Sequence, residues 1–380
     1  MSSDPATNVA PQWRPTLKSD LSVGPNLWSG RTLISSVGVA HSDRLIELGL
    51  QERLIMEALD GQRTLTEACD HIAEATAGAI AVDVCARTIN TFLRYGLLEL
   101  PYAAQNGSRL GWESGPDESE TSPRAADYSL STAPAEWVRR ASRFVAPKTT
   151  VIALGLAGLA GLVLTVWLGP DLVADLTAVH ITGVWWTLLA VVLGAVWQVL
   201  VLVGHELAHA LVFAKFSDRS PGFAIVRLNA YFYSPASRMI GFTLIVEKWK
   251  RLLILGAGPA LSAAATLVPV LVWIASNSVE VRQAASVALA MAWLFIVLGL
   301  LPVPNTDGTR ILATIADIGD LPAAAQAHWT AKRTGRPGGG LPKSLPRVTR
   351  IVSRHYPVFF FGFLGAVLLI AGSIWLRVLT

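Results

Sequence analysis

Charged residues and cysteine are both scarce in this chain. Only 15% of its 380 residues are Asp, Glu, Lys or Arg, whereas 52% are hydrophobic, far more than in a typical soluble protein. The two cysteines, Cys69 and Cys85, suit a reducing compartment better than a disulfide framework. The N-terminus lacks a charged segment followed by an apolar core, so we expect no cleavable signal peptide. These absences predict a membrane protein whose soluble part stays in the cytosol.

Five long runs contain no Asp, Glu, Lys, Arg or His, and they cover residues 149–170, 181–204, 252–279, 283–306 and 356–376. Each exceeds the roughly 18 residues that mark a membrane-spanning helix. Lys and Arg are concentrated before the first run, between the second and third, and between the fourth and fifth, so these segments should face the cytoplasm. We therefore predict a mainly α-helical, multi-pass cell-membrane protein of about five transmembrane helices, with residues 149–380 as the membrane domain.

The sequence His205-Glu206-Leu207-Ala208-His209 follows the second run directly, on a helix that should continue to residue 214. Two histidines four residues apart lie on one face of a helix, so both can bind one metal ion while the intervening Glu reaches a water molecule there. Polar groups at membrane depth are costly and are usually functional. A chance match, or two histidines satisfied by neighbouring helices, is the alternative. A hydrolytic metal site also requires a third ligand.

Asp307 is the candidate third ligand. The second and fourth runs both travel from the outside to the cytoplasm, which brings His205, His209 and Asp307 to the same side of the membrane. The alternative is that Asp307 is the N-cap of a helix beginning near Gly308, since Asp is a favoured cap residue. A cap does not explain the agreement in depth with the two histidines, so the sequence favours a ligand.

On these residues the chain resembles the site-2 protease family of intramembrane zinc metallopeptidases. That family pairs HExxH on one spanning helix with a later (L)DG motif, and the likeness covers most of residues 181–310. The resemblance implies one Zn²⁺ held by His205, His209 and Asp307, with Glu206 as the general base that activates water. The distribution of Lys and Arg places this site toward the cytoplasm.

The sequence around Gly258 and Pro259 resembles GPxxN, a second sequence element of the same family. The resemblance implies a substrate-binding role for Gly258, Pro259, Ser262 and Asn305. Small residues at such positions also have a plain explanation, because they let spanning helices approach closely.

Three positions depart from the family pattern. Ser262 stands where the family has the Asn thought to hold substrate, Gly299 stands where relatives commonly have Asn, and Thr306 replaces the Leu of LDG. These departures leave the metal chemistry intact, but they put the substrate-holding polar groups in doubt.

The segment between the second and third runs has a strand-like composition. Residues 223–234 are rich in aromatic and β-branched residues, Pro235 follows, and residues 239–249 resume a strand-like pattern. The resemblance implies a β-hairpin dipping toward the active site, whose edge could take an extended substrate as an added strand. The alternative is an interfacial element anchored by Tyr231, Tyr233 and Trp249.

The part before the membrane domain divides into three. Residues 1–30 are expected to be disordered, 31–102 to fold as a small α+β domain, and 103–148 to form a linker and a basic juxtamembrane segment. Within the folded part we expect a strand, three helices and a closing strand, which is a winged-helix arrangement; the ranges are Arg31–Ala40, Leu45–Leu59, Thr64–Ala75, Val82–Tyr95 and 97–100.

Residues 31–102 resemble the PqqD-like peptide-recognition domain of pathways that make ribosomally synthesised, post-translationally modified peptides. The resemblance is carried by LGLQERLIMEALDGQRTLTEACDHI at 48–72 and by RYGLLEL at 94–100. Such domains bind a leader peptide by strand addition. Nucleic acid is not expected as a partner, because residues 41–100 contain ten acidic residues against five Arg and no Lys. A purely structural cap is the alternative role.

The sequence therefore predicts an intramembrane zinc endopeptidase that cleaves a peptide or membrane-associated substrate, with leader removal in peptide natural-product maturation as the favoured role. One alternative is regulated intramembrane proteolysis of a signalling protein such as an anti-sigma factor. Another is a non-catalytic membrane immunity or transport factor. The intact Glu206 argues against the last of these, since binding alone needs no general base.

Overall fold

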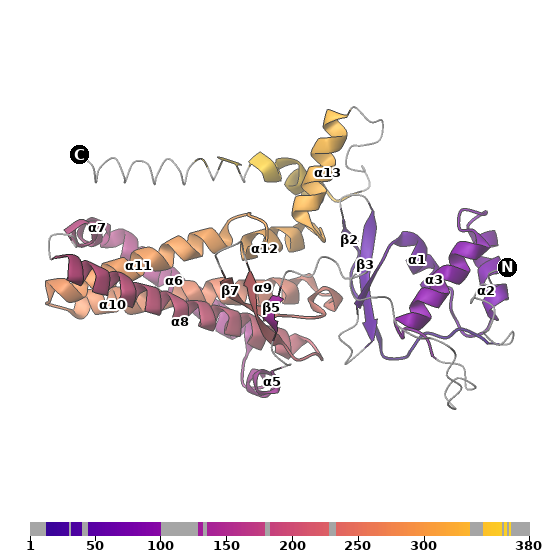
Figure 1. Ribbon diagram of the computed structural model, residues 1–380, viewed down its shortest axis with the longest axis horizontal. Coiled ribbons are helices and arrows are strands. Elements are labelled where there is room, and N and C mark those ends of the chain that lie inside the picture. Colours follow the sequence, from indigo (N-terminus) through magenta and orange to yellow (C-terminus); the bar gives the residue numbers. More distant parts are fainter. Residues whose placement is uncertain are drawn as a thin grey trace. The chain divides into compact units, whose positions relative to one another are not determined.

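The computed structural model describes residues 13–29, 32–39, 45–99, 128–131, 135–178, 183–227, 233–334, 345–358, 361–362 and 365. The chain forms two compact units. The N-terminal unit comprises residues 1–28, 32–127 and 240–246, and the second, helical unit comprises residues 29–31, 128–239 and 247–380. Each unit is described separately (Figure 1).

The N-terminal unit combines an antiparallel sheet with three helices. Strand β3 pairs with β1 and β2 along one edge and with β4 along the other. The strands are β1 (Leu21–Val23), β2 (Leu27–Trp28), β3 (Leu33–Val39) and β4 (Leu45–Leu48), and the helices are α1 (Leu50–Glu57), α2 (Leu65–Ala75) and α3 (Val82–Arg94). Their apolar faces meet in one core, which includes Val37, Leu48, Ile55, Ile72, Ile89 and Phe92.

The helix signals in this unit are confirmed where they were strongest. Thr64 is the N-cap of α2 and forms a capping box with Glu67, in which each side chain bonds the backbone of the other residue. Gly96 follows α3 with a φ of 70°, the left-handed conformation that glycine adopts most easily. Cys69 and Cys85 are free thiols buried in the core.

Three details of the N-terminal unit differ from the sequence prediction. Residues 45–48 form strand β4 rather than the first turn of a helix. Four residues are too few to distinguish the two-residue repeat of a strand from the 3.6-residue repeat of a helix, and pairing with β3 decides in favour of the strand. The expected closing strand is only a single bridge between Leu98 and Leu17. Residues 13–29, expected to be disordered, contain β1 and β2 and bury Trp13. Residues 1–12 lie outside the described part.

The second unit is mainly helical, and four of its helices are long and apolar enough to cross a membrane: Pro147–Trp167, Val184–Phe216, Lys248–Ala275 and Val279–Leu300. These correspond to the first four predicted spans. The fifth, 356–376, falls mostly outside the described residues. Large apolar side chains such as Leu156 and Leu200 are about 60% exposed, as expected of surfaces that lipid covers.

The long helices pack side by side as a bundle (Figure 1). Helix α9 contacts α6, α8 and α12, and α8 also packs on α11, so α8 and α9 are neighbours over much of their length. The helices of this unit are α5 (Glu136–Ser142), α6 (Pro147–Trp167), α7 (Gly169–Ala178), α8 (Val184–Phe216), α9 (Lys248–Ala265), α10 (Leu267–Ala275), α11 (Val279–Leu300), α12 (Asp307–Ala316) and α13 (Leu321–Arg333).

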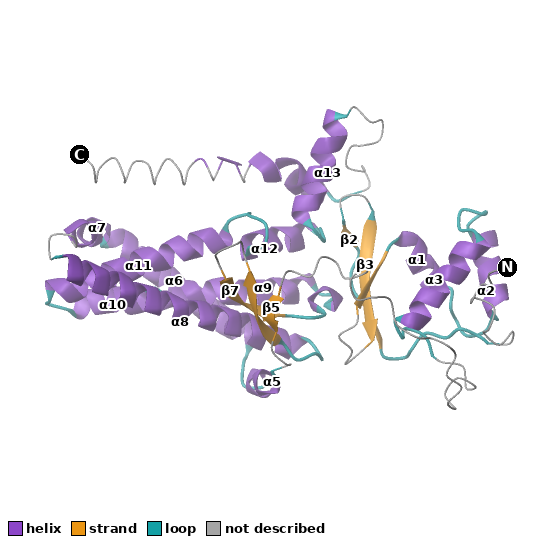
Figure 2. Cartoon of the chain, viewed as in Figure 1, coloured by secondary structure: helices purple, strands orange, loops and turns teal. Residues whose placement is uncertain are grey.

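A three-stranded antiparallel sheet lies beside the helices (Figure 2). Its order is β5 (Tyr128–Ser131), β6 (Gly222–Arg227), β7 (Tyr233–Arg238), so the end of the predicted linker supplies one edge strand. The expected hairpin is present, but its second strand is β7 and not residues 239–249, which contain a short 3₁₀ helix and the start of α9. Pro235 is tolerated because β7 is an edge strand.

Trp249 lies on α9, where its ring meets Phe216 edge-on and Lys148 lies over it at 4.3 Å. The hairpin alternative had also named Tyr231, which lies outside the described residues.

Candidate metal centre

Three side chains from two distant parts of the chain converge inside the second unit. The Nε2 atoms of His205 and His209, both on α8, lie 3.1 Å apart. Asp307 Oδ2, at the start of α12, lies 2.8 Å from His205 Nε2 and 3.3 Å from His209 Nε2. Among the described residues this is a group of ligand atoms that could hold a metal ion. The sequence had predicted all three of these residues as ligands.

The donor set and its spacing fit a zinc ion. Zinc favours imidazole nitrogen and carboxylate oxygen at about 2.0–2.2 Å, and a tetrahedral arrangement at that length separates neighbouring ligand atoms by roughly 3.3 Å. The three separations found here are 2.8, 3.1 and 3.3 Å, so one matches that value and the shortest lies about half an ångström below it. Three protein ligands leave a fourth position for water, as catalytic zinc sites require.

The Asp307 side chain does not cap helix α12, so its carboxylate is available to the histidines. The N-cap of α12 is Thr306, whose side chain accepts a hydrogen bond from the backbone N–H of Thr309. Thr306 Oγ1 also donates to the carbonyl groups of Leu301 and Val303. Asp307 is therefore the first residue of the helix and not its cap, which removes the alternative role. Thr306, one of the departures from the family pattern, has a capping function.

Charge further favours the ionised form of Asp307. Burial alone would raise the pKa of this carboxyl group, but hydrogen bonds from His205 and His209 and their charge outweigh it. The pKa of Asp307 consequently lies well below its ordinary value, so the side chain is a carboxylate at neutral pH.

Both ends of α12 are fixed. At its start, Gly308 lies so close to α11 that a Cβ there would be 2.0 Å from the Leu300 carbonyl oxygen, which accounts for the glycine of the Asp-Gly pair. At its end, Asp317 pairs with Lys248 Nζ of α9 at 2.5 Å. The helix that presents Asp307 therefore contacts α11 at its start and α9 at its end.

Glu206 points to the β7 strand. Its Oε2 accepts a hydrogen bond of 2.6 Å from the backbone N–H of Ser237. The hairpin thus reaches the HExxH helix, as the resemblance implied. Sequence reasoning missed Ser237 because the group involved is a backbone N–H, which every residue except proline has.

Gly258 of α9 lies against both histidines. A Cβ at this position would be 2.3 Å from His209 Nε2 and 2.6 Å from His205 Nε2, the two atoms that face Asp307. The absence of a side chain leaves room for the two imidazoles, which is a packing reason for glycine at this position. Pro259 follows within the helix interior.

A Gly258→Ala substitution is expected to reduce Zn²⁺ affinity strongly, because the added methyl group would push an imidazole out of place. The measurement is competition for Zn²⁺ against a chromogenic chelator. Gly256→Ala is the matched control, since a Cβ there would meet nothing within 4 Å. Equal affinities in the two variants would contradict the role assigned to Gly258.

Asn305, Gly299 and Ser262, the other positions that the family resemblance singled out, have different surroundings. Asn305 is exposed and has a φ of 70°, a left-handed turn that Asn tolerates, which accounts for this residue without a substrate. A Cβ at Gly299 would meet nothing within 4 Å, so no close contact explains this glycine. Ser262 is buried and bonds His205.

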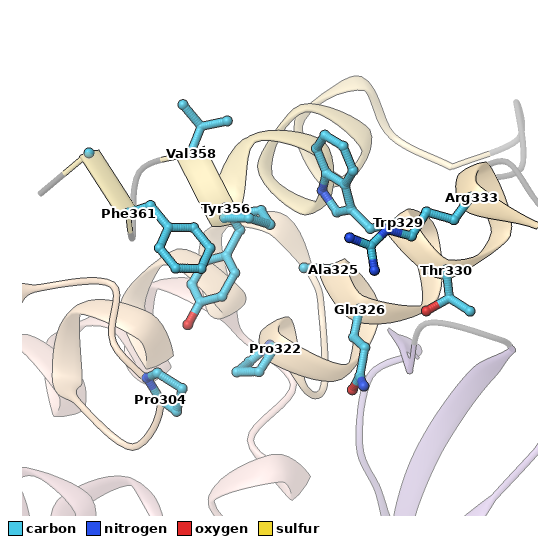
Figure 3. A pocket seen from close by; sticks show the side chains of 12 residues that line it. Pro304, Pro322, Ala325, Gln326, Trp329, Thr330, Arg333, Tyr356, Val358 and Phe361 are labelled. Carbon is cyan, nitrogen blue, oxygen red and sulfur yellow. The ribbon is translucent and has the colours of Figure 1, made fainter. Parts of the chain in front are cut away.

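A separate cavity of about 1010 Å³ lies between α13 and residues 356–358 and 361–362. Figure 3 shows Tyr356 and Phe361 on one side of it and Trp329 and Arg333 of α13 on the other. None of His205, Glu206, His209 and Asp307 lines it, although Pro304 does. It is therefore distinct from the metal centre.

Comparison of the chain with known protein families, with curated proteins and with solved structures finds no match. The function of the site consequently has to be argued from its own geometry and chemistry.

Proposed function

We propose that this chain is a zinc-dependent intramembrane endopeptidase. The observation that carries the proposal is the convergence of His205, His209 and Asp307, whose ligand atoms all lie within 4.8 Å of one another, with Glu206 beside them in the sequence. The two histidines are on a helix long and apolar enough to cross a membrane. A group of this composition has little structural use at such a place, where ionisable residues are costly.

The residues divide the chemistry of peptide hydrolysis between them. A zinc ion in this site supplies Lewis-acid activation of water and of the scissile carbonyl group. Glu206 accepts the proton of the attacking water and then delivers it to the leaving nitrogen, so the proton count balances over one cycle. The bond from Ser237 holds one carboxylate oxygen of Glu206 and leaves the other to carry the proton.

The favoured substrate is a peptide precursor recruited by the N-terminal unit, whose leader would be removed. Strand β4 is at the edge of its sheet, pairing with β3 among the described strands. A groove of about 320 Å³ lies between β4 and α3, and its lining includes apolar side chains such as Ile46 and Val84, the hydroxyl group of Thr88, and the charged groups of Glu52 and Arg87. An edge strand beside a groove of mixed apolar, hydroxyl and charged side chains suits an extended peptide, which gains backbone bonds from the strand and side-chain contacts from the groove.

The experiment that tests the activity uses the full-length chain in detergent micelles. Candidate precursor peptides and single-span membrane proteins, chosen from the neighbouring genes, are incubated with it and analysed by mass spectrometry. We expect one of them to be cleaved, the cleavage to stop with 1,10-phenanthroline, and added Zn²⁺ to restore it. Cleavage that is insensitive to the chelator would contradict a metal mechanism. Cleavage of a single-span signalling protein alone would instead support regulated proteolysis.

A Thr88→Trp substitution tests the recruitment site. The indole would fill the groove between β4 and α3, so the Kd for a fluorescently labelled precursor peptide is expected to rise at least about tenfold, or roughly 1.4 kcal/mol. Fluorescence anisotropy with the full-length chain measures this change. Glu74→Trp, on the exposed side of α2, is the control and should bind normally. Unchanged binding by Thr88→Trp would assign the unit a structural role.

A further inference from the structure

Helix α9 holds both imidazoles of the metal centre by their second ring nitrogens. His209 Nδ1 lies 2.6 Å from the carbonyl oxygen of Ile254, and His205 Nδ1 lies 2.8 Å from the hydroxyl oxygen of Ser262. Ile254 and Ser262 both belong to α9. Because Nδ1 of each ring is bonded in this way, the Nε2 atoms of both rings face Asp307.

These bonds decide which nitrogen carries the proton. A metal ligand needs a free lone pair on Nε2, so the proton of the neutral ring has to sit on Nδ1. The Ile254 carbonyl can only accept, which sets the tautomer of His209. The Ser262 hydroxyl can accept as well, and it is 7% exposed, so water is poorly placed to replace it. Without the hydroxyl, the Nδ1–H of His205 would lose its bond inside the bundle.

We propose that Ser262 is a positioning residue for His205 and not a group that holds substrate. Nδ1 and Nε2 lie on different edges of the imidazole ring, and the hydroxyl lies at the edge away from Asp307. A substrate bound beside the metal would therefore meet the Nε2 side of the ring. This inference rests on the proposed zinc chemistry, and it gives Ser262 a function at the position where the family resemblance implied substrate contact.

The test separates the hydroxyl group from side-chain volume. Thr and Val have nearly the same shape, but only Thr keeps a hydroxyl, so Ser262→Thr and Ser262→Val form a matched pair. Zn²⁺ affinity is measured on the full-length protein in micelles by chelator competition, and the visible spectrum of the Co²⁺-loaded protein reports ligand geometry. We expect Ser262→Val and Ser262→Ala to raise the Kd for Zn²⁺ by about 10–100-fold and to alter the Co²⁺ spectrum, and Ser262→Thr to stay close to wild type.

Ser286→Ala is the control for removing a buried hydroxyl. Ser286 lies on α11, is 3% exposed, and its hydroxyl has no hydrogen-bond partner in the described part of the chain. Its Zn²⁺ affinity should not change. Equal losses in Ser286→Ala and Ser262→Ala would indicate general packing damage and overturn the inference.

Two further outcomes are distinguishable. If the wild-type chain binds no Zn²⁺, the proposed function itself fails. If it binds Zn²⁺ and the Thr and Val variants bind it equally, the zinc chemistry stands and the positioning role is wrong. A raised KM for the peptide with unchanged Zn²⁺ affinity would restore the substrate-holding role instead.

Discussion

Replacing Glu206 by Gln is expected to lower kcat for peptide hydrolysis by about 10²–10⁴-fold, the usual contribution of a general acid–base group. Gln has nearly the same volume, and its amide oxygen can still accept the hydrogen bond from the Ser237 N–H. It cannot take a proton from water, however, so only the chemical step should suffer. Zn²⁺ affinity is expected to remain, because Glu206 is not among the three ligand residues. Initial rates and chelator competition on the same preparation measure both quantities.

A matched substitution shows whether the effect belongs to this carboxylate. Glu247 is an exposed acidic residue just before α9 and pairs with Lys250 at 2.5 Å. Glu247→Gln removes the same charge from the same unit and should leave kcat nearly unchanged. If the Glu206→Gln protein cleaved at the wild-type rate, the endopeptidase proposal would fail. If it were inactive in the test tube yet preserved the biological output in cells, a non-catalytic role would be favoured.

The long helices could be predicted because their sequence signal is simple. An uncharged run of more than about 18 residues has few other stable arrangements, and the four described spans lie close to the runs that predicted them. Short elements were harder. Residues 45–48 fit a strand or a helical turn equally well, and only the partner strand β3, which the local sequence does not contain, decides between them.

The second strand of the hairpin shows the same limit. The strand-like composition ended before Pro235, and a proline in the middle of a sheet would remove a ladder hydrogen bond. The structure instead places β7 at the sheet edge, where a missing N–H is tolerated. Whether a strand lies at the edge depends on the whole sheet, so the edge position of β7 could not be predicted from the residues around Pro235.

For the candidate site, the sequence predicted three side chains that the structure brings together, those of His205, His209 and Asp307. The spacing of His205 and His209 and the shared direction of two spans were enough to predict them together with Asp307. Sequence reasoning could not find the groups that act through the backbone or through an absent atom: the Ser237 N–H, the Ile254 carbonyl and the missing Cβ of Gly258. These contacts depend on how close α9 and β7 come to α8, and the local sequence does not determine the distance between packed elements.

Replacing Asp307 by Asn is expected to raise the Kd for Zn²⁺ by more than about 100-fold. Loss of a residue that only hydrogen-bonds a metal ligand raises this Kd by roughly 10–100-fold, and here a direct ligand and its negative charge are both removed. Cleavage should fall with the loss of the ion. Without added metal the melting temperature should fall as well, because the Asp307 carboxylate bonds His205 and His209, so the Kd for Zn²⁺ is the quantity that identifies Asp307 as a ligand. Chelator competition and the melting temperature of the metal-free protein measure the two effects separately.

Thr306→Ala provides the converse variant. It removes the capping oxygen, which costs about 0.5–2 kcal/mol in typical helices, and leaves the Asp307 carboxylate in place. We expect this protein to melt at a lower temperature but to retain most of its Zn²⁺ affinity. The two substitutions, one residue apart, should therefore differ in their effect on Zn²⁺ affinity. If Asp307→Asn lowered the melting temperature and left Zn²⁺ affinity intact, the carboxylate would be a structural group. The site would then have only two protein ligands, too few for the catalytic zinc centre proposed here.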